Sequence, residues 1–266
     1  MDAFEEITYE RLAAVTRITQ NRPSKRNAQN ERMLDELDAA FAAAERDETC
    51  RVIILAGAGD HFSAGHDIKE GLAKRGDATV EGRFAFEDEK YFRYALRIFD
   101  VTKPTIAQVQ GACVAGAFMV ANMCDLIVAS EDAYFADPVL HSFACPAVEV
   151  LVHPYVLGVR GAKDMLFTGR RFDAHEAFRM GMVSRLVPRA DLEQTTLALA
   201  EHIAKAAPFA LKLAKRSINR VLDMQGFRAA LSAHFDTHQL GHVSSEAQEK
   251  AGQGAGSRIA AGKMQR

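Results

Sequence analysis

Tryptophan is absent from this sequence of 266 residues, and cysteine occurs only four times. Cys50, Cys113, Cys124 and Cys145 show no CxxC spacing. This distribution argues against a disulfide framework and against a cysteine-based zinc motif. We therefore interpret the four cysteines as buried thiols of a protein in a reducing compartment.

A long apolar run and an excess of one charge are also missing. No apolar stretch approaches the ~20 residues that a membrane helix needs. Residues 1–6 are acidic and lack the apolar region of a secretory signal, so we expect a cytoplasmic protein with no membrane partner. The 33 Lys and Arg against 35 Asp and Glu give a net charge of −2, which disfavours a nucleic-acid partner.

The residues that are present predict an α/β fold. Short apolar runs are typical of strands buried on both faces, and segments of helical spacing lie between them. Asn30 is placed to cap a helix that begins at Glu31. The predicted elements are a hairpin over 7–19, helices over 31–45 and 83–99, and strands over 52–55, 105–109 and 126–128.

Strand patterns stop near residue 190, and the remaining chain has helical spacing. Residues 192–206, 209–222 and 227–239 each repeat apolar residues at the period of a helix. We predict two parts on this basis. Residues 1–190 form an α/β core, and residues 191–266 form a helical C-terminal region.

Two loops rich in small residues follow predicted strands. Residues 62–68 follow the strand at 52–55, and residues 109–117 follow the next strand and open a helix. Small residues let a ligand approach the backbone, and amides at the start of a helix have no acceptor within it. Two such loops facing each other could donate two hydrogen bonds to one thioester oxygen, as an oxyanion hole does. Either loop alone is better explained as a turn.

Five motifs occur in order between about residues 7 and 190, and their shared register makes them specific together. They are Asn21-Arg22-Pro23 with Asn27-Ala28; Ser63-Ala64-Gly65-His66-Asp67-Ile68; Lys103-Pro104-Thr105-Ile106-Ala107 with Gly111 and Gly116; Cys124-Asp125-Leu126-Ile127-Val128-Ala129; and Phe167-Thr168-Gly169 through Glu176-Ala177 and Gly181-Met182-Val183 to Val187-Pro188. The sequence thus resembles the crotonase superfamily, also called the enoyl-CoA hydratase/isomerase family. The resemblance implies a spiral of repeated ββα units, a helical C-terminal oligomerisation region, and a homotrimer or dimer of trimers.

The resemblance also implies the site. Family members hold a thioester oxygen with two backbone N–H groups, which here would belong to His66 and Gly116. The substrate would be an acyl-CoA, with no metal and no separate cofactor. Lys25 and Arg26 are candidates to bind the phosphates of coenzyme A, and a role in keeping an exposed loop soluble is an equal alternative. For Asp67 the alternative to substrate binding is that its side chain orders the loop or caps a helix. The implied substrate-binding residues are Lys25, Arg26, Ala64, Asp67, Ile68, Met119 and Val139.

Two carboxyl groups of the family's hydratases are missing at the matching positions. A hydratase of this family carries a glutamate three residues after the second oxyanion glycine, where this sequence has Met119. It carries another after the proline of its F-x-x-P-E segment, where this sequence has Val139. Neither side chain can transfer a proton, so we predict that ordinary addition of water to an enoyl-CoA is lost.

Other ionisable residues are candidates for the missing acid–base groups. Glu149 lies between two valines, where desolvation would raise its pKa; a surface or subunit-interface charge is the alternative. His141 is a second candidate, whereas His153 is interpreted as structural. The ring of His66 is interpreted as pocket lining, with proton transfer as the alternative.

Three functions remain open from the sequence. The first is an enzyme that stabilises an enolate or oxyanion of an acyl-CoA, as hydratases and isomerases of the family do. The second is a hydrolase of a thioester or a carbon–carbon bond that uses Glu149 or His141. The third is a non-catalytic acyl-CoA-binding protein. Release of free thiol would favour the second, and binding without turnover would favour the third.

Overall fold

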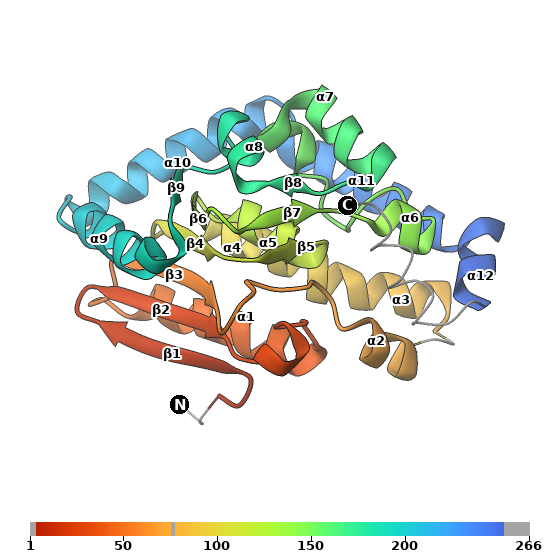
Figure 1. The fold of residues 1–266 in the computed structure, drawn as a ribbon, viewed down its shortest axis with the longest axis horizontal. Helices are drawn as coiled ribbons and strands as arrows, with labels where there is room; N and C mark the ends of the chain where they lie inside the picture. Colours follow the sequence, from red (N-terminus) through yellow and green to blue (C-terminus); the bar gives the residue numbers. More distant parts are fainter. Residues whose placement is uncertain (1–3, 76–77, 253–266) are drawn as a thin grey trace.

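The computed structural model describes residues 4–75 and 78–252, and a six-stranded sheet is its largest feature (Figure 1). The strands are β1 (Ile7–Leu12), β2 (Val15–Gln20), β3 (Val52–Gly57), β4 (Thr105–Val109), β6 (Leu126–Ser130) and β9 (Arg185–Val187), in the spatial order β1-β2-β3-β4-β6-β9. The hairpin of β1 and β2 is antiparallel, and the other neighbours are parallel. The predicted hairpin and the three predicted buried strands are therefore confirmed.

Helices surround this sheet, and the first of them starts as predicted. Asn30 accepts a hydrogen bond from the amide of Met33 at 3.0 Å and so caps α1. The helices are α1 (Glu31–Arg46), α2 (Ile68–Arg75), α3 (Val80–Glu87), α4 (Tyr94–Asp100), α5 (Gly116–Met123), α6 (Val139–Phe143), α7 (His153–Thr168), α8 (Ala174–Arg179), α9 (Leu192–Ala204), α10 (Pro208–Met224), α11 (Phe227–His242) and α12 (Ser245–Gly252), with 3-10 turns η1 (Pro23–Lys25) and η3 (Arg189–Asp191) and a π-helical segment η2 (Asp88–Arg93).

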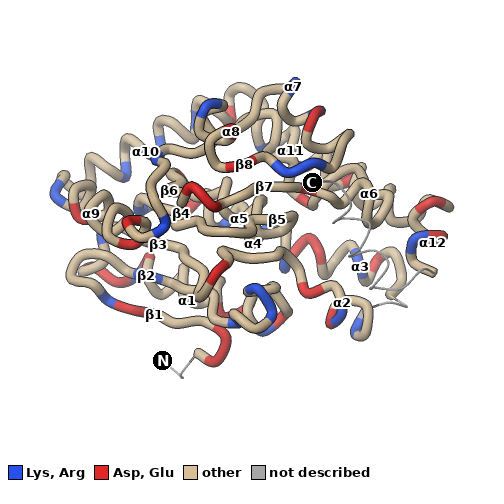
Figure 2. Tube along the Cα trace, in the orientation of Figure 1, with Lys and Arg blue, Asp and Glu red and all other residues tan. Residues whose placement is uncertain are grey.

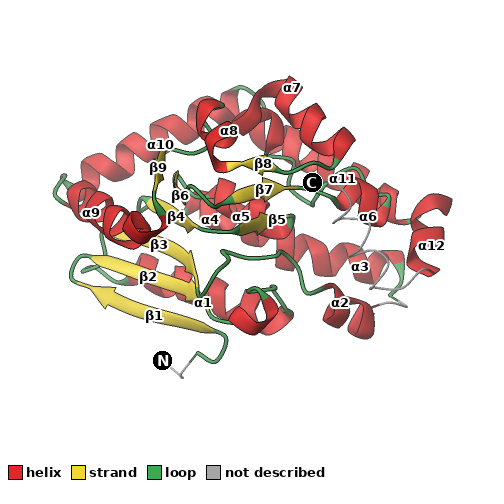
Figure 3. Ribbon diagram, viewed as in Figure 1, coloured by secondary structure: helices red, strands yellow, loops and turns green. Residues whose placement is uncertain are grey.

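A second, three-stranded sheet gives the fold its repeat. Its order is β5 (Ala112–Val114), β7 (Tyr134–Ala136) and β8 (Phe172–Asp173). The runs β4-β5-α5 and β6-β7-α6 each place one strand in the large sheet and the next in the small sheet before a helix follows. This is the repeated ββα arrangement that the resemblance implied. Figure 3 shows α7 and α8 beyond β8, on the opposite side of the molecule from β1 and β2.

Two predicted elements differ from the structure. The helix predicted over 83–99 begins at Val80 and is divided by η2, whose wider turn brings Tyr91 and Phe92 to the core. The loop predicted over 111–117 contains β5, because its amides pair with β7 and with the segment that begins at Ser63. A segment rich in small residues carries a weak strand pattern, so the strand β5 depends on the segments that pair with it.

The core lies on both faces of the large sheet. Every residue of β3 and β4 is buried, as the continuous apolar run of β3 predicted. One face packs against α1, α4, α5 and α11, with Phe227 and Phe235 contributing from α11. The other face packs against α9 through Leu192 and Ala200. Helices α9 and α11 of the C-terminal region thus share the core, and the division at residue 190 stays a prediction.

Charged residues are mixed along the surface. Lys and Arg are interspersed with Asp and Glu along the trace, as the net charge of −2 suggests (Figure 2). Within residues 4–75 and 78–252, no helix is both long enough and apolar enough to cross a membrane. Helices α2, α3, α6 and α12 gather at the end of the molecule opposite α9 (Figure 1).

Candidate active site

The two predicted oxyanion loops lie against each other. The amide of Ser63 donates to Ala112 O at 2.9 Å, and the amide of Val114 donates to Ser63 O at 3.2 Å. Gly65 has φ +84°, and a Cβ built there would lie 2.5 Å from Val114 O and 3.1 Å from Gly116 N. Only glycine lets the first loop approach the second this closely.

The two predicted donor residues are in direct contact. A Cβ built at Gly116 would lie 2.3 Å from Nε2 of His66, so the histidine ring occupies the space that a side chain would need. Gly116 is the first residue of α5, and its amide has no acceptor inside that helix. Ala115, just before it, has φ 52° and ψ −116°, a conformation that is strained for any residue with a Cβ.

The N-terminal segment is hydrogen-bonded to the first loop. The amide of Ala64 donates to Arg26 O at 2.9 Å, and Ser63 Oγ donates to Asn27 O at 2.7 Å. Lys25 and Arg26 are both exposed beside this contact. The structure thus brings these two candidate phosphate contacts to the edge of the predicted site.

Asp67 anchors the end of the same loop. Its carboxylate lies 3.1 Å from Nη1 of Arg22 and accepts a hydrogen bond from the amide of Glu70 at 3.2 Å, in the first turn of α2. The interpretation of Asp67 as a residue that orders its loop and caps a helix is confirmed. Ala64 and Ile68, on either side, are half-buried.

Glu149 lies close to His66, one of the two predicted donor residues. Its Oε1 lies 3.8 Å from Nδ1 of His66, and a face of that ring stacks on Tyr91 at a centroid distance of 3.7 Å. Glu149 is 6% exposed, and its Oε2 makes no hydrogen bond within the described part of the chain. Burial raises the pKa of Glu149 above its ordinary value, although the charges of His66 and His238 act against that rise. The sequence-based expectation for its pKa is therefore confirmed in direction.

A buried pair holds the segment that carries Glu149. Asp137 accepts hydrogen bonds from the amides of Val139 and Val148, at 3.0 and 2.9 Å, and lies 3.2 Å from Nε2 of His153. His153 stacks on Phe118, and neither partner of the pair is exposed. The interpretation of His153 as structural is confirmed.

His141 makes its contacts elsewhere. Its Nε2 lies 3.1 Å from Phe167 O, and its ring packs on Gly169. It lines a cavity of about 340 Å³ together with residues of α12. His141 takes no part in the contacts of His66 and Glu149 described above. The structure therefore does not bring the two candidates, Glu149 and His141, together in one site.

The two positions at which we expected the family's glutamates lie in different surroundings. Met119 is fully buried in α5, and Val139 is half-buried at the start of α6 and packs against the core. Neither side chain carries a group that titrates. Among the ionisable groups, the ring of His66 lies beside Gly116, and Glu149 lies beside that ring.

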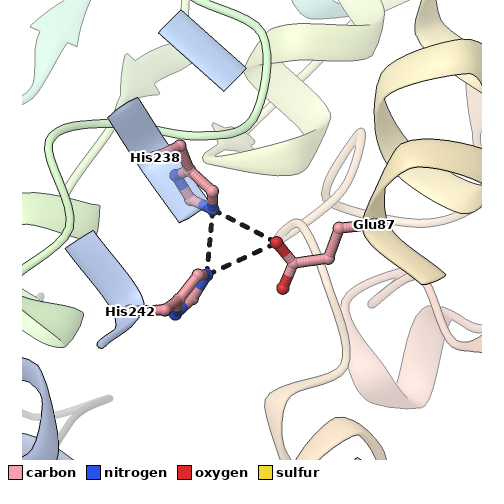
Figure 4. A group of neighbouring side chains, drawn as sticks. All are labelled: Glu87, His238 and His242. Carbon is pink, nitrogen blue, oxygen red and sulfur yellow. Dashed lines mark hydrogen bonds and ion pairs between the residues drawn. The ribbon is translucent and has the colours of Figure 1, made fainter. Parts of the chain in front are cut away.

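A cluster that the sequence reasoning missed lies directly behind Glu149. Glu149 Oε1 is 3.7 Å from Nε2 of His238, and that nitrogen is 3.4 Å from Oε2 of Glu87. His242 completes the cluster, one helical turn after His238 (Figure 4). The spacing of His234, His238 and His242 along one helix face was a visible signal, but it did not identify Glu87.

Comparison with known proteins decides the family. The sequence profile described as enoyl-CoA hydratase/isomerase matches residues 10–255. The chain belongs to the enoyl-CoA hydratase/isomerase family. The resemblance drawn from the five motifs is confirmed, and the match extends through most of the helical C-terminal region.

Relatives of this family member agree in sequence and in fold. EchA13 of Mycobacterium tuberculosis, named as an enoyl-CoA hydratase with the activity marked as unproven, is 41% identical over 259 residues, 90% of this chain and 81% of that protein. A crystal structure described as a probable enoyl-CoA hydratase of Mycobacterium smegmatis has 46% identity and a TM-score of 0.86, covering 92% of this chain and 97% of the other. An enoyl-CoA hydratase/isomerase of Xanthobacter autotrophicus Py2 has 35% identity and a TM-score of 0.90, covering 97% of each chain. The predicted α/β fold with a helical C-terminal region is confirmed.

Proposed function

We propose that this enoyl-CoA hydratase/isomerase family member is an enzyme that acts on an acyl-CoA thioester and holds its carbonyl oxygen with the amides of His66 and Gly116. The observation that carries the proposal is the contact between the two loops, where Gly65 lies against Val114 and Gly116 lies against the ring of His66. Two amides at such a contact would stabilise the negative charge of an enolate or a tetrahedral oxyanion. The names of the relatives, as enoyl-CoA hydratases, support the same class of substrate.

We assign proton transfer to Glu149. It is the carboxyl group that lies beside His66, and it is buried with one oxygen that makes no hydrogen bond in the described structure. Lys25 and Arg26, which are exposed next to the first loop, would contact the phosphates of coenzyme A. Ala64, Asp67, Ile68, Met119 and Val139 remain the proposed lining of the substrate site.

The amide of Gly116 can be tested without disturbing its crowded surroundings. A side chain at this position would collide with the ring of His66, so both changes should be made in a His66→Ala background, which keeps the amide of residue 66. In that background Gly116→Ala adds a Cβ and keeps the N–H, whereas Gly116→Pro removes the N–H. We expect Gly116→Pro to lower kcat/KM for the best acyl-CoA of a broad panel by about 10²–10³ relative to Gly116→Ala. Equal kinetics in two variants with matching melting temperatures would refute the oxyanion assignment.

Glu149 can be tested with an isosteric change. We expect Glu149→Gln to lower kcat by about 10²–10⁴ while acyl-CoA affinity changes little, because the amide keeps the shape but cannot exchange a proton. Glu201→Gln, on the exposed side of α9, is the matched control and should leave kcat unchanged. A Glu149→Gln enzyme with full turnover would remove Glu149 from the mechanism.

Hydrolysis of a thioester or of a carbon–carbon bond is the second candidate. Met119 and Val139 favour it, because the two glutamates of water addition are missing while a buried carboxyl group lies beside a histidine. A thiol-trapping assay detects thioester hydrolysis, which releases free coenzyme A, whereas hydration and isomerisation do not. Hydrolysis of a carbon–carbon bond keeps the thioester, so it is detected by the mass of the two shorter products. Binding of acyl-CoA without any turnover would contradict both and support a purely binding role.

Restoring the missing acids gives a complementary test. We expect Met119→Glu with Val139→Glu to gain hydratase activity on an enoyl-CoA if the loops already hold the thioester. Hydratase activity would be measured as a decrease in the absorbance of the conjugated enoyl thioester. A folded double variant that binds acyl-CoA and hydrates no enoyl-CoA would show that more than these two groups separates this chain from a hydratase.

We also propose that the chain works in the cytoplasm as a trimer or a dimer of trimers. The four cysteines are buried free thiols, as expected in a reducing compartment. Apolar side chains remain exposed along α10 in the single chain, among them Phe209, Ile218 and Met224. A second copy of the chain would cover such a surface.

A further inference from the structure

Three potential metal ligands converge between α3 and α11. Figure 4 shows Glu87 facing His238 and His242, which lie four residues apart on one face of α11. Oε2 of Glu87 lies 3.4 Å from Nε2 of each histidine, and the two Nε2 atoms are 3.0 Å apart. The side chains are 12%, 2% and 17% exposed, so little water reaches them.

The outer atoms of these side chains are already held in place. Nδ1 of His238 lies 2.8 Å from Ala147 O, and because a carbonyl only accepts, this nitrogen carries the proton. The opposite nitrogen, Nε2, is thereby directed toward Glu87, and a metal ion bound there would take the place of any proton on it. Nδ1 of His242 lies 3.5 Å from Sγ of Cys145, and Gln239 donates at 2.6 Å to Oε2 of Glu87, the same oxygen that faces the histidines. Such outer contacts are what fix the orientation of histidine and carboxylate ligands at metal sites.

We propose that Glu87, His238 and His242 bind one divalent transition-metal ion. Metal–nitrogen and metal–oxygen bonds of about 2.0–2.2 Å at tetrahedral angles separate neighbouring ligand atoms by about 3.3–3.5 Å. The observed separations of 3.0, 3.4 and 3.4 Å fit one face of such a tetrahedron. A metal cation bound at this point would replace the protons that otherwise bridge the two Nε2 atoms and the Glu87 carboxylate.

The ligand set indicates the class of metal. Two imidazole nitrogens and one carboxylate oxygen suit Zn²⁺ and its neighbours Co²⁺ and Ni²⁺, whereas Mg²⁺ and Ca²⁺ prefer oxygen ligands alone. Three protein ligands leave a fourth position for water or another group, which is the pattern of catalytic rather than structural zinc sites. Glu149, 3.7 Å from Nε2 of His238, is the carboxylate nearest to that nitrogen after Glu87.

The site is separate from the two proposed amide donors, although Glu149, the proposed proton-transfer residue, lies 3.7 Å from His238. It contains neither His66 nor Gly116, and metal binding is measured without any substrate. It also differs from the sequence-based expectation of no metal, because the glutamate is 151 positions before the first histidine (238 − 87) and only packing brings them together. Failure of metal binding would therefore leave the oxyanion proposal untouched, and failure of the oxyanion test would leave this site standing.

The test begins with the full-length protein after treatment with a strong chelator and removal of that chelator. We expect it to bind one equivalent of Zn²⁺ per chain and to show, with Co²⁺, the visible absorption bands of a four- or five-coordinate ion. Zinc should also raise the melting temperature, because binding to the folded state alone stabilises it. Less than half an equivalent of zinc at 100-fold excess, or no visible Co²⁺ bands, would overturn the proposal and leave a proton-bridged cluster.

Variants of the proposed ligands test whether the metal ion binds at these residues. Glu87→Gln keeps the shape of its side chain, and His242→Asn replaces the ring with a smaller polar group that does not reach the position of Nε2. Each should weaken zinc binding at least about 100-fold, since losing even an outer contact costs 10–100-fold. His175→Asn, at an exposed histidine of α8, is the matched control and should bind as the wild type does. His242 is the most exposed ligand, so its variant is the one best able to fold, which circular dichroism will establish. Wild-type affinity in either folded ligand variant would overturn the assignment.

Discussion

Gly65 stands where the loop of residues 62–68 approaches Val114 and Gly116. We expect Gly65→Ala to lower the free energy of unfolding by about 2–4 kcal/mol, because φ +84° strains a side chain and its Cβ would meet Val114 O at 2.5 Å. Gly181 has the same φ, and nothing lies within 4 Å of a Cβ built there. Gly181→Ala should therefore cost only about 1–2 kcal/mol in urea unfolding. Equal losses would mean that the loops do not press together at Gly65.

Asp137 gives the protein a predictable response to acid. Burial by itself raises the pKa of Asp137, but the hydrogen bond and charge of His153 and the amides of Val148 and Val139 outweigh it, so the pKa lies below 3.8. A carboxyl group with a lowered pKa contributes stability that is present above its ordinary pKa and is lost as the pH falls through the lowered one.

The measurement is urea unfolding of the wild type and Asp137→Asn between pH 2 and 7. We expect the variant to be less stable by about 1–3 kcal/mol at pH 7, because a neutral amide cannot serve the two backbone amides and the nearby His153 ring as an anion does. The difference should shrink as the pH falls below 3.8, where the wild-type carboxyl takes up its proton. A difference that stays constant down to pH 2 would contradict the lowered pKa.

At the scale of one element, the start of α5 is strained. Ala115 holds φ 52° and ψ −116°, a backbone conformation that glycine adopts freely. We expect Ala115→Gly to raise the free energy of unfolding by about 1 kcal/mol. Ala198→Gly, at an exposed position of α9, should lower it by about 0.5–1 kcal/mol and serves as the control. Destabilisation by both changes would show that the turn before Gly116 stores no strain.

Helix α11 serves the candidate site from a distance along the sequence. His234 lies 2.9 Å from Val148 O through Nε2, and His238 bonds to Ala147 O, so two histidines of one face hold the backbone just before Glu149. Burial lowers the pKa of His234 to about 4, which keeps its ring neutral near pH 7. The same helix then directs the Nε2 atoms of His238 and His242 toward Glu87. One amphipathic helix thus positions both the carboxyl candidate and the proposed metal ligands.

At the scale of the whole molecule, exposed apolar residues of α10 bear on self-association. Ile218 is 64% exposed and Met224 is 88% exposed in the single chain. We expect light scattering to give a molar mass three or six times that of one chain, and Ile218→Glu to shift it toward the monomer, because a buried charge opposes association. Ala198→Glu, on α9, should leave the assembly intact. A wild-type protein that is a monomer at micromolar concentration would contradict the predicted trimer.

The sequence determined the elements whose signals are local. The apolar run of β3 required burial on both faces, the turn residues after β2 closed the hairpin unit, and Asn30 fixed the start of α1. The small residues around Gly65 and Gly116 predicted two loops able to approach closely. Each of these signals acts within a few residues of chain, so no knowledge of packing was needed to recognise it.

Tertiary structure alone decided the rest. The strand β5 exists because β7 and the Ser63 segment pair with it, and the π-helical turn that brings Tyr91 to His66 is set by packing against the core. Glu149 meets His66, and Glu87 meets His238, across 83 and 151 positions of sequence. No local pattern encodes such distances, because they depend on how whole helices settle against a shared core.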